Sequence, residues 1–280
     1  MNTLLSIGHG FSARALAPRL LSEGWRVIGT TRSEDKAEAL LAEGIEPLIW
    51  PGTPLPIDQA THFLTSVAPG KDGDPVLAAF SDQLKSATHL KWVGYLSTTG
   101  VYGDHQGEWV DESTTLTPST ARGQARVEAE AAWQALGLPL HIFRLAGIYG
   151  PGRGPFAKVR KGTARRIIKD NQVFSRIHVD DIAAVVEASI RKPNPGAIYN
   201  VCDDDPAPPQ DVIEYAADLL GLPVPPAVAF EDADMTPMAR SFYAESKRVR
   251  NDRIKDELGI KLTYPDYRTG LKALLKAEPR

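Results

Sequence analysis

Two arginines, Arg122 and Arg126, open the segment ARGQARVEAE (residues 121–130), and their chemistry needs an explanation. Their spacing places them one turn apart at the start of a predicted helix that ends near Gly137. Because a helix start already carries a partial positive charge, an exposed cation there costs roughly 0.3–1 kcal/mol. A bound anion, from a substrate or a cofactor, would offset that cost. The alternative is a solvated surface pair in which Arg126 meets Glu130 one turn later.

The apolar pattern of this helix predicts which way the two arginines face. One stripe of the helical wheel is made of Ala125, Ala129, Ala132, Trp133 and Leu136. Arg122 continues that stripe one turn earlier, and Arg126 lies at its edge. We therefore expect both guanidinium groups on the flank that faces the rest of the protein.

A glycine-rich loop, GHGFSA at residues 8–13, follows the first apolar run directly and opens a helix. Gly8 permits a tight turn, Gly10 lets the backbone approach a pyrophosphate, and Ala13 allows close packing of the helix on the strand. The free N–H groups of the helix start then face the anion. This context predicts a dinucleotide site made by Gly8, Gly10, Phe11, Ser12 and Ala13. The alternative is a glycine turn that binds no ligand.

The end of the second apolar run indicates which dinucleotide to expect. An NAD site usually has an Asp or Glu there for the ribose hydroxyls. Here the sequence is TTRS (30–33), with no carboxylate before Glu34. Arg32, with the hydroxyls of Thr31 and Ser33, suits the 2′-phosphate of NADP(H), because a guanidinium makes charge-assisted hydrogen bonds. The sequence therefore favours NADP(H) over NAD, unless Arg32 is a solvated surface residue.

Short apolar runs alternate with helical patterns through the first half of the chain. Strands are expected at 3–7, 26–31, 46–50, 61–67, 91–98, within 138–150, and at 197–201. Ser33 and Asp74 are predicted to cap two of the helices between them. This alternation predicts an α/β fold, a Rossmann-type doubly wound parallel sheet, with ligands at the carboxyl ends of its strands.

Beyond Gly150 the pattern loosens, and a second, smaller unit is expected. We predict a dinucleotide-binding domain at 1–150 with 176–202, and a small C-terminal substrate lobe at 151–175 with 203–280. The lobe carries two basic runs, RKGTARRIIK and SKRVRNDRIK. Charge runs of this kind are usually solvated.

Five further segments resemble one known family. They are YLSTTGVYGD (95–104), DESTTLTP (111–118), RLAGIYGPGR (144–153), RIHVDDIA (176–183) and GAIYNV (196–201). In this order, after the glycine loop, they resemble the extended short-chain dehydrogenases/reductases, in the NAD-dependent epimerase/dehydratase branch, over most of the chain. The resemblance implies a Rossmann fold, a nicotinamide cofactor and a second lobe that binds substrate, often a nucleotide sugar. It also allows a homodimer.

The resemblance further implies a catalytic Ser/Thr–Tyr–Lys set, and the chain departs from it. By position the Ser/Thr is Thr98, while Arg122 stands where the family has Tyr and Arg126 where it has Lys. Glu130 supports this register. Since an arginine keeps its proton at any working pH, it cannot run general acid–base chemistry. Thr98 is expected to hold a substrate oxygen, Arg122 to bind or polarise it, and Arg126 to bind the cofactor ribose.

Catalysis at such a site needs another acid. The candidates are Tyr102, His105, Tyr149 and His178, with Tyr102 and His178 preferred. Contacts with the substrate are expected from Thr98, Arg122, Tyr149, Arg153, Arg176 and Arg248. A small anionic or sugar-like molecule, such as a nucleotide sugar, would suit these cations and hydroxyls.

Composition narrows the class of protein. The 280 residues carry a formal net charge of −3, which argues against nucleic acid as the main partner. The single cysteine excludes an internal disulfide, and no apolar run is long enough for a membrane span, so we expect a cytoplasmic protein without a signal peptide. The six histidines show no metal-ligand spacing, so no metal is expected.

Two functions remain open from the sequence. One is an atypical NADP(H)-dependent oxidoreductase, or an epimerase/dehydratase-like enzyme (an isomerase), that acts on a small anionic or sugar-like substrate. The other is an NADP(H)-binding sensor or regulator without turnover, which the loss of the Tyr–Lys pair favours. The glycine loop, Thr98 and the second lobe favour ligand chemistry.

Overall fold

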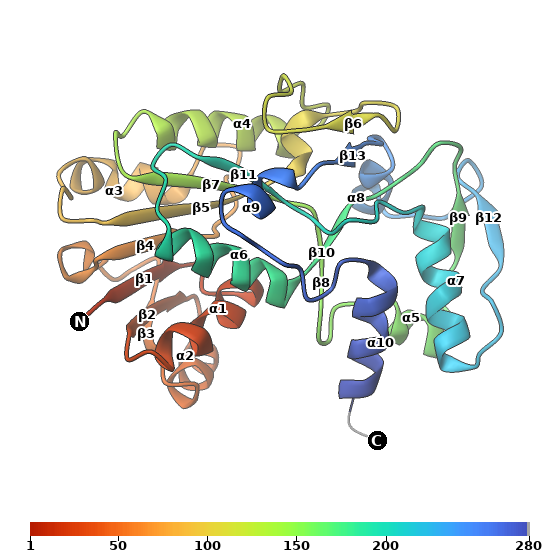
Figure 1. Cartoon of the computed structure of the whole chain (residues 1–280), viewed down its shortest axis with the longest axis horizontal. Helices are drawn as coiled ribbons and strands as arrows, with labels where there is room; N and C mark the ends of the chain where they lie inside the picture. The colour runs from red at the N-terminus through yellow and green to blue at the C-terminus, as the bar shows by residue number, and fades with distance from the viewer. Residues whose placement is uncertain (279–280) are drawn as a thin grey trace.

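A parallel sheet of seven strands lies at the centre of the computed structural model, which describes residues 1–278 (Figure 1). The strands are β1 (Thr3–Ile7), β2 (Arg26–Thr31), β3 (Glu46–Ile49), β4 (His62–Thr65), β5 (Trp92–Thr98), β7 (Leu140–Leu145) and β11 (Ile198–Val201). Their order is β11-β7-β5-β4-β1-β2-β3, and every neighbouring pair is parallel. The predicted Rossmann-type doubly wound sheet is therefore confirmed, with the strand order reversing between β1 and β4.

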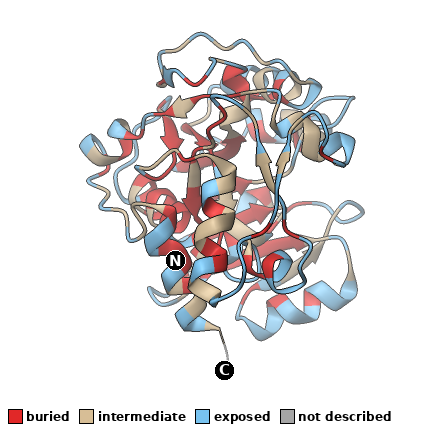
Figure 2. Cartoon of the chain, turned by 90° about the vertical axis from the view of Figure 1, so that its right-hand side faces the viewer, coloured by how far each residue is buried: buried red, intermediate tan, exposed pale blue. Residues whose placement is uncertain are grey.

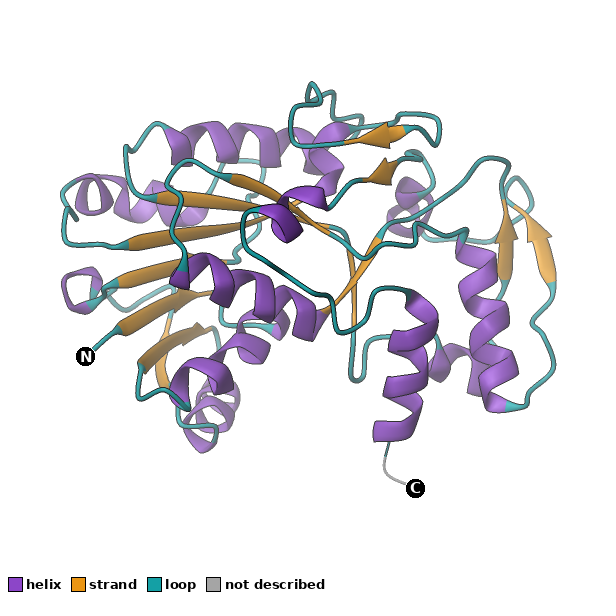
Figure 3. Ribbon diagram, in the orientation of Figure 1, coloured by secondary structure: helices purple, strands orange, loops and turns teal. Residues whose placement is uncertain are grey.

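Helices cover both faces of the sheet (Figure 3), because the side chains of each strand alternate between the two faces. Leu4 of β1 belongs to the core beneath α1 (Phe11–Leu21) and α6 (Val179–Arg191). Its neighbour Leu5 belongs to the core beneath α3 (Pro75–Lys85) and α4 (Ala121–Gln134). The buried residues, red in Figure 2, are accordingly concentrated in the strands and on the inner helix faces. Two short 3₁₀ helices flank these strands: η1 (Ile57–Gln59) precedes β4, and η2 (Thr99–Tyr102) follows β5.

A side-chain capping bond is present at one of the two predicted N-cap residues. Asp74 Oδ1 accepts hydrogen bonds from the N–H groups of Val76 and Leu77, at 2.8 and 3.2 Å, at the start of α3. Ser33 occupies the N-cap position of α2 (Glu34–Ala42), but its hydroxyl makes no capping bond within the described residues. The predicted N-cap position of Ser33 is therefore confirmed, but its hydroxyl makes no capping bond, and two carboxylates in the first turn of α2 supply the favourable charge.

A third core lies away from the sheet. It joins α5 (Phe156–Arg160), α7 (Pro209–Leu220) and α10 (Tyr267–Ala277). A parallel ribbon of β9 (Arg166–Ile168) and β12 (Ala227–Ala229) contacts α7, and α8 (Pro237–Phe242) follows it in the chain. The predicted division of the chain into two domains stays a prediction.

One segment of the predicted small lobe packs with the sheet instead. It comprises β13 (Arg248–Val249) and α9 (Asp252–Asp256), whose Val249 and Ile254 lie in the core beneath α1 and α6. β13 also pairs with β6 (Trp109–Val110), close to the end of β5 in the chain.

Two short strands lie between the sheet and the third core. β8 (Gly147–Tyr149) and β10 (Arg176–His178) pair in parallel there, as Figure 1 shows. They carry three of the predicted site residues, Tyr149, Arg176 and His178. None of the described helices has the length and hydropathy that a membrane crossing requires.

Candidate functional site

The glycine loop is held against the sheet by its backbone. Gly8 has a left-handed φ of +72°, and a Cβ there would lie 2.9 Å from Val67. The Gly8 N–H donates to Thr30 Oγ1 at 2.8 Å, which ties the loop to β2. Gly10 is the N-cap of α1, and a Cβ there would have the Gly8 carbonyl oxygen, 3.6 Å away, as its neighbour within 4 Å. The loop therefore leaves room at the helix start for close approach of a pyrophosphate.

His9, between the two glycines, adds no charge to this loop. Its ring packs against Gly29 of β2, where a Cβ would lie 2.8 Å from the ring. Burial lowers the pKa of His9 to about 4, so the imidazole is neutral at physiological pH. Positive potential at the loop therefore comes from the start of α1.

Arg32 lies directly after β2 and is exposed. Its guanidinium makes no hydrogen bond or ion pair with any of residues 1–278. Thr31 and Ser33 beside it are partly exposed. All the guanidinium donors are thus available to an anion at the edge of the dinucleotide loop.

Arg126 reaches the carboxyl end of β5. Its Nη1 donates to the Tyr95 hydroxyl and to the Leu96 carbonyl oxygen, each at 2.9 Å. Its guanidinium carbon lies 5.5 Å from the centre of the Tyr95 ring. The cation is therefore fixed two residues from Thr98, while Nε and Nη2 find no acceptor among the described residues.

The alternative surface pair between Arg126 and Glu130 is wrong, because Glu130 is buried with another partner. Arg144 Nη2 donates to Glu130 Oε2 at 2.8 Å, and Ser97 Oγ donates to Glu130 Oε1 at 2.5 Å. Arg144 Nη1 also donates to the Tyr102 hydroxyl at 2.9 Å, which itself donates to Asn200 Oδ1 at 2.7 Å. This network is one connected set of buried polar groups beneath the end of the sheet.

The network leaves Tyr102 poorly placed as a proton donor. The side chain is fully buried, and burial raises the pKa of Tyr102 to about 12 even though Arg144 lowers it. Its hydroxyl proton is already donated to Asn200. The geometry argues for a structural role of Tyr102.

Arg122 is exposed and turns toward α8. Its Nη2 donates to Ser241 Oγ at 2.9 Å, and its guanidinium carbon lies 4.8 Å from the centre of the Phe242 ring. A hydroxyl and an aromatic ring at α8 therefore contact the Arg122 guanidinium, and the expected anion at this cation stays a prediction.

The inner face of α4 differs from the apolar stripe read from the sequence. The buried residues are Gly123, Ala129, Glu130 and Trp133, whereas Ala132 is exposed. Gly123 packs so closely on η2 that a Cβ there would lie 2.7 Å from the Gly100 carbonyl oxygen. Because Gly123 and the paired Glu130 are buried, the buried face of α4 is rotated about the helix axis from the predicted stripe. The expectation that both arginines face inward therefore holds for Arg126 and is wrong for Arg122.

Thr98 is the last residue of β5 and is partly exposed. Its Oγ1 accepts a hydrogen bond from the Gly100 N–H at 3.2 Å, which caps η2 and fixes the side chain. The hydroxyl proton has no acceptor among the described residues, so it is free to be donated. Thr98 thus ends the strand whose Tyr95 and Leu96 bind Arg126.

His178 and Tyr149 belong to the packing between the sheet and the small lobe. His178 Nδ1 accepts from the Asp180 N–H at 3.2 Å, and its ring centre lies 4.0 Å from that of Tyr264. Burial lowers the pKa of the His178 imidazole and raises that of the Tyr149 phenol. Tyr149 Oη lies 3.5 Å from the Asp266 carbonyl oxygen. Both side chains are buried, and this argues against His178 as the catalytic acid.

Besides Arg122, three arginines are predicted to bind substrate, and they lie in three different places. Arg176 is largely buried, and its Nη1 donates to two backbone carbonyl oxygens at 2.8 and 3.0 Å. Arg248 donates to the Gly107 carbonyl oxygen. Arg153 is exposed and lies over the ring of Phe11, beside the cofactor loop.

Asp203, two residues after β11, is a residue that the sequence reasoning misses. It is 1% exposed, and neither carboxyl oxygen has a hydrogen-bond partner of normal geometry among the described residues. Burial raises the pKa of Asp203 to about 8, against the opposing effect of Arg176. The sequence signal is a run of three aspartates, which by itself indicates a solvated turn.

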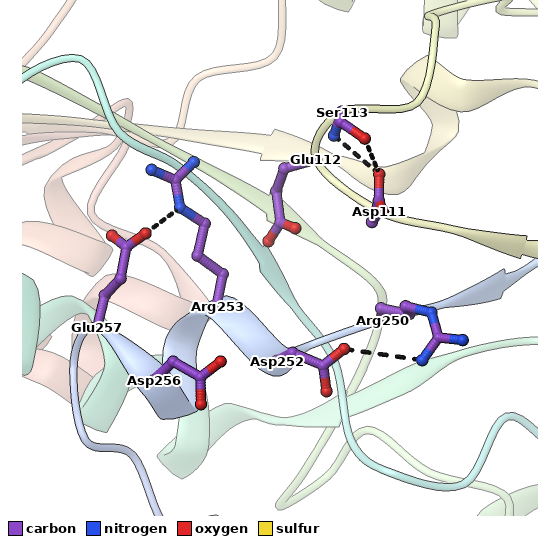
Figure 4. Close-up of a pocket in the computed structure, with 8 residues that line it drawn as sticks. All are labelled: Asp111, Glu112, Ser113, Arg250, Asp252, Arg253, Asp256 and Glu257. Carbon is purple, nitrogen blue, oxygen red and sulfur yellow. Dashed lines mark hydrogen bonds and ion pairs between the residues drawn. The ribbon is translucent and has the colours of Figure 1, made fainter.

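A separate pocket of about 460 Å³ lies between the loop after β6 and α9 (Figure 4). Its lining residues are Asp111, Glu112, Ser113, Arg250, Asp252, Arg253, Asp256 and Glu257. Carboxylates outnumber arginines there, so the pocket does not suit an anionic substrate. Nowhere in residues 1–278 do three or more His, Cys, Asp or Glu side chains gather to hold a metal ion.

The chain is similar in sequence to several known proteins. No family model matches the sequence. A conserved protein of unknown function from Silicibacter pomeroyi DSS is 64% identical, covers 99% of both chains and superposes with a TM-score of 0.96. Protein YeeZ of Escherichia coli strain K12 is 29% identical in an alignment of 283 positions that covers 95% of this chain and 97% of YeeZ. A 3-diazoavenalumate denitrifying reductase of Streptomyces sp is 30% identical in an alignment of 177 positions that covers 58% of this chain and 55% of the reductase.

Two solved structures have the same fold as this chain over nearly its whole length. A protein from Methylobacillus flagellatus, provisionally assigned to the NAD-dependent epimerases/dehydratases, is 28% identical over 99% of this chain and 98% of its own, with a TM-score of 0.70. At 17% identity, a UDP-glucuronic acid 4-epimerase from Bacillus cereus, solved with NAD, has the same fold over 98% of both chains, with a TM-score of 0.78. This chain therefore resembles the NAD-dependent epimerases/dehydratases of the extended short-chain dehydrogenase/reductase type in fold, and resembles the Methylobacillus flagellatus protein in sequence as well.

Proposed function

We propose that the protein is an atypical NADP(H)-dependent oxidoreductase, related to the epimerases and dehydratases, that acts on a small anionic or sugar-like substrate. The observation that carries the proposal is the placement of Thr98 and Arg126 at the carboxyl end of β5. In a parallel sheet this is the same edge as the glycine loop after β1. A dinucleotide lying across that edge would therefore meet both residues.

The residues at this edge fit a nicotinamide dinucleotide. The φ of +72° at Gly8 and the open space at Gly10 suit the pyrophosphate, and the free guanidinium of Arg32 suits a 2′-phosphate. One structural neighbour, the human epimerase family protein SDR39U1, was solved with NADPH. When bound, the nicotinamide supplies or accepts a hydride.

The protein side chains would orient the reactants and stabilise charge. Thr98 donates its free hydroxyl proton to a substrate oxygen, and Arg126 donates from Nε and Nη2 to the cofactor ribose. A permanent cation beside the reacting oxygen also stabilises negative charge that develops there. We propose that the proton itself comes from water, since both arginines keep theirs and Tyr102 is buried in the Arg144 network.

Similar proteins support the proposed reaction class and substrate class. The partial relative that is a reductase favours hydride transfer, and the structural neighbour solved with UDP-glucose and NAD favours a sugar-like substrate. A cytoplasmic location and a homodimer belong to the same proposal. The single cysteine, buried as a free thiol, is in keeping with a reducing compartment.

A sensor without turnover is the second candidate, and the contact of Arg122 favours it. With Arg122 engaged by Ser241 and Phe242, the position that carries the family's tyrosine holds the small lobe in place. Such a protein would change shape with the redox state of the cofactor and transfer no hydride.

Hydride exchange separates the two candidates. NADPH deuterated on its nicotinamide is incubated with aldehydes, ketones and nucleotide sugars, and deuterium transfer is followed by mass spectrometry. We expect transfer to one substrate class, reduced about tenfold or more in Thr98→Val because an oxygen-binding donor is lost. The matched control is Thr99→Val, one residue along in η2. NADPH binding without transfer to any compound would support the sensor. Absence of binding by both NADPH and NADH would contradict both candidates.

A further inference from the structure

Arg153 is an exposed cation without a polar partner. Its guanidinium carbon lies 5.5 Å from the centre of the Phe11 ring, and its side chain donates to no acceptor among residues 1–278. Contact with an aromatic face uses the charge of a guanidinium and leaves its N–H groups free. Arg153 therefore presents its full set of donors beside the first residue of α1.

The backbone that carries Arg153 is firmly seated. Gly150 and Arg153 exchange two backbone hydrogen bonds of 2.9 Å, which close a tight turn directly after β8. A Cβ at Gly150 would lie 2.7 Å from Val179 and 3.1 Å from Phe11, so the turn packs against the starts of both α6 and α1. The turn thus has a defined position, while the end of the Arg153 side chain is free to move toward a ligand.

Arg153 lies beside the start of α1, which is electropositive. Helix α1 begins at Phe11 with unpaired backbone N–H groups, and its first turn contains no acidic residue. Gly10, immediately before it, leaves open space. A guanidinium beside the start of a helix is an arrangement suited to binding a diphosphate.

We propose that Arg153 closes over the diphosphate of the bound cofactor, so that the turn after β8 and the first turn of α1 hold the anion between them. This inference rests on the proposed cofactor site and reassigns Arg153 from the substrate to the cofactor. It also separates the roles of two exposed arginines. Arg32 would read the 2′-phosphate that only NADP(H) carries, whereas Arg153 would bind the diphosphate that NADP(H) and NAD(H) share.

The test is a comparison of cofactor affinities in matched variants. Wild type, Arg153→Gln, Arg153→Lys and Arg32→Gln are titrated with NADPH and with NADH, and binding is followed by nicotinamide fluorescence. Arg165→Gln is the control, since Arg165 is an exposed arginine of the same lobe that bonds only backbone carbonyls. Arg153 is exposed, so we expect its variants to fold, and thermal unfolding midpoints verify this.

We expect Arg153→Gln to weaken NADPH and NADH by the same factor, about tenfold, because a charge-assisted hydrogen bond is lost in both complexes. Arg153→Lys, which keeps the charge, should recover part of the affinity. The salt dependence of binding should also become shallower in Arg153→Gln. Arg32→Gln should weaken NADPH and leave NADH unchanged.

Three results would overturn the inference. The first is equal affinity of Arg153→Gln and wild type for both cofactors. The second is a loss confined to NADPH, which would assign Arg153 to the 2′-phosphate. The third is unchanged cofactor binding with weaker binding of UDP-glucose, which would assign Arg153 to a substrate anion. Failure of wild type to bind either cofactor would instead refute the proposed function, and the inference with it.

Discussion

At the scale of single residues, two arginines one turn apart on α4 have opposite surroundings. Arg126 is partly buried and donates to the Tyr95 hydroxyl and the Leu96 carbonyl oxygen. Arg122 is exposed and meets Ser241 and Phe242. Neutral groups of the protein itself thus contact both cations at this helix start.

This difference predicts different effects on stability. Arg126→Ala leaves the Leu96 carbonyl oxygen and the buried Tyr95 hydroxyl without their donor, so the free energy of unfolding should fall by about 1–3 kcal/mol. Arg122→Ala removes an exposed contact and should change that free energy by less than about 1 kcal/mol. Urea unfolding of both variants measures the difference. Equal losses would show that the two guanidinium groups are equivalent.

Asp203 predicts a pH dependence of stability. Its pKa is raised by burial from an ordinary 3.8 to about 8, with Arg176 opposing the rise and Asp205 adding to it. The Tyr149 phenol also faces this carboxyl. A raised pKa means that the folded state holds the proton more tightly than the unfolded chain. The contribution is therefore full below about pH 4 and is lost as the pH rises toward 8.

Replacing the carboxyl should remove that trend. In Asp203→Asn the free energy of unfolding should vary less between pH 4 and 8 than in wild type, because this titration is gone. Asp252→Asn is the control, since Asp252 forms an exposed ion pair with Arg250 and does not shift the pKa of Asp203. Denaturant unfolding at several pH values makes the comparison. A wild-type slope that persists in Asp203→Asn would refute the assignment.

At the scale of elements, the segment from α8 to β13 acts as a strap across the start of α4. Ser119 Oγ donates to Glu245 Oε1 at 2.6 Å, and Lys247 Nζ donates to the Gly103 carbonyl oxygen at 2.7 Å. With the Arg122–Ser241 contact, these bonds attach the small lobe to the loop that follows Thr98. A movement of this segment would therefore displace the backbone at Gly103, close to Thr98 in the chain.

The ammonium of Lys247 is the most buried of these contacts. Lys247 is 9% exposed, and Lys247→Met would remove the donor to the Gly103 carbonyl oxygen and to Glu245 Oε2. We expect faster amide hydrogen exchange in residues 236–248, measured by mass spectrometry, because local opening costs less. Lys255→Met, which removes a more exposed ion pair with Asp204, should leave that exchange unchanged. Similar exchange in both variants would argue against the strap.

At the scale of the whole molecule, the fold is built from signals that are local in the chain. The strands, the glycine loop and the Asp74 cap could be predicted because each depends on residues within one short segment. The absence of the family's tyrosine and lysine rests on sequence register alone and stays a prediction. Proteins with the same fold over 98–99% of the chain agree with the predicted architecture.

The partners of polar side chains could not be predicted in the same way. Arg144 of β7 donates to Glu130 of α4, and Arg122 donates to Ser241 across 119 positions. Arg153, after β8, lies over the ring of Phe11 at the start of α1. Each contact depends on where two distant elements meet, and no periodicity records this.

The sequence alone therefore determined the architecture and the type of loop that a dinucleotide needs, because apolar periodicity and glycine turns act over a few residues. Only the tertiary structure decided which arginine lies inward at β5, which is held by α8 and which faces the start of α1. The physical reason is that a charged group takes the nearest acceptor or aromatic face in space, and chain folding chooses that neighbour.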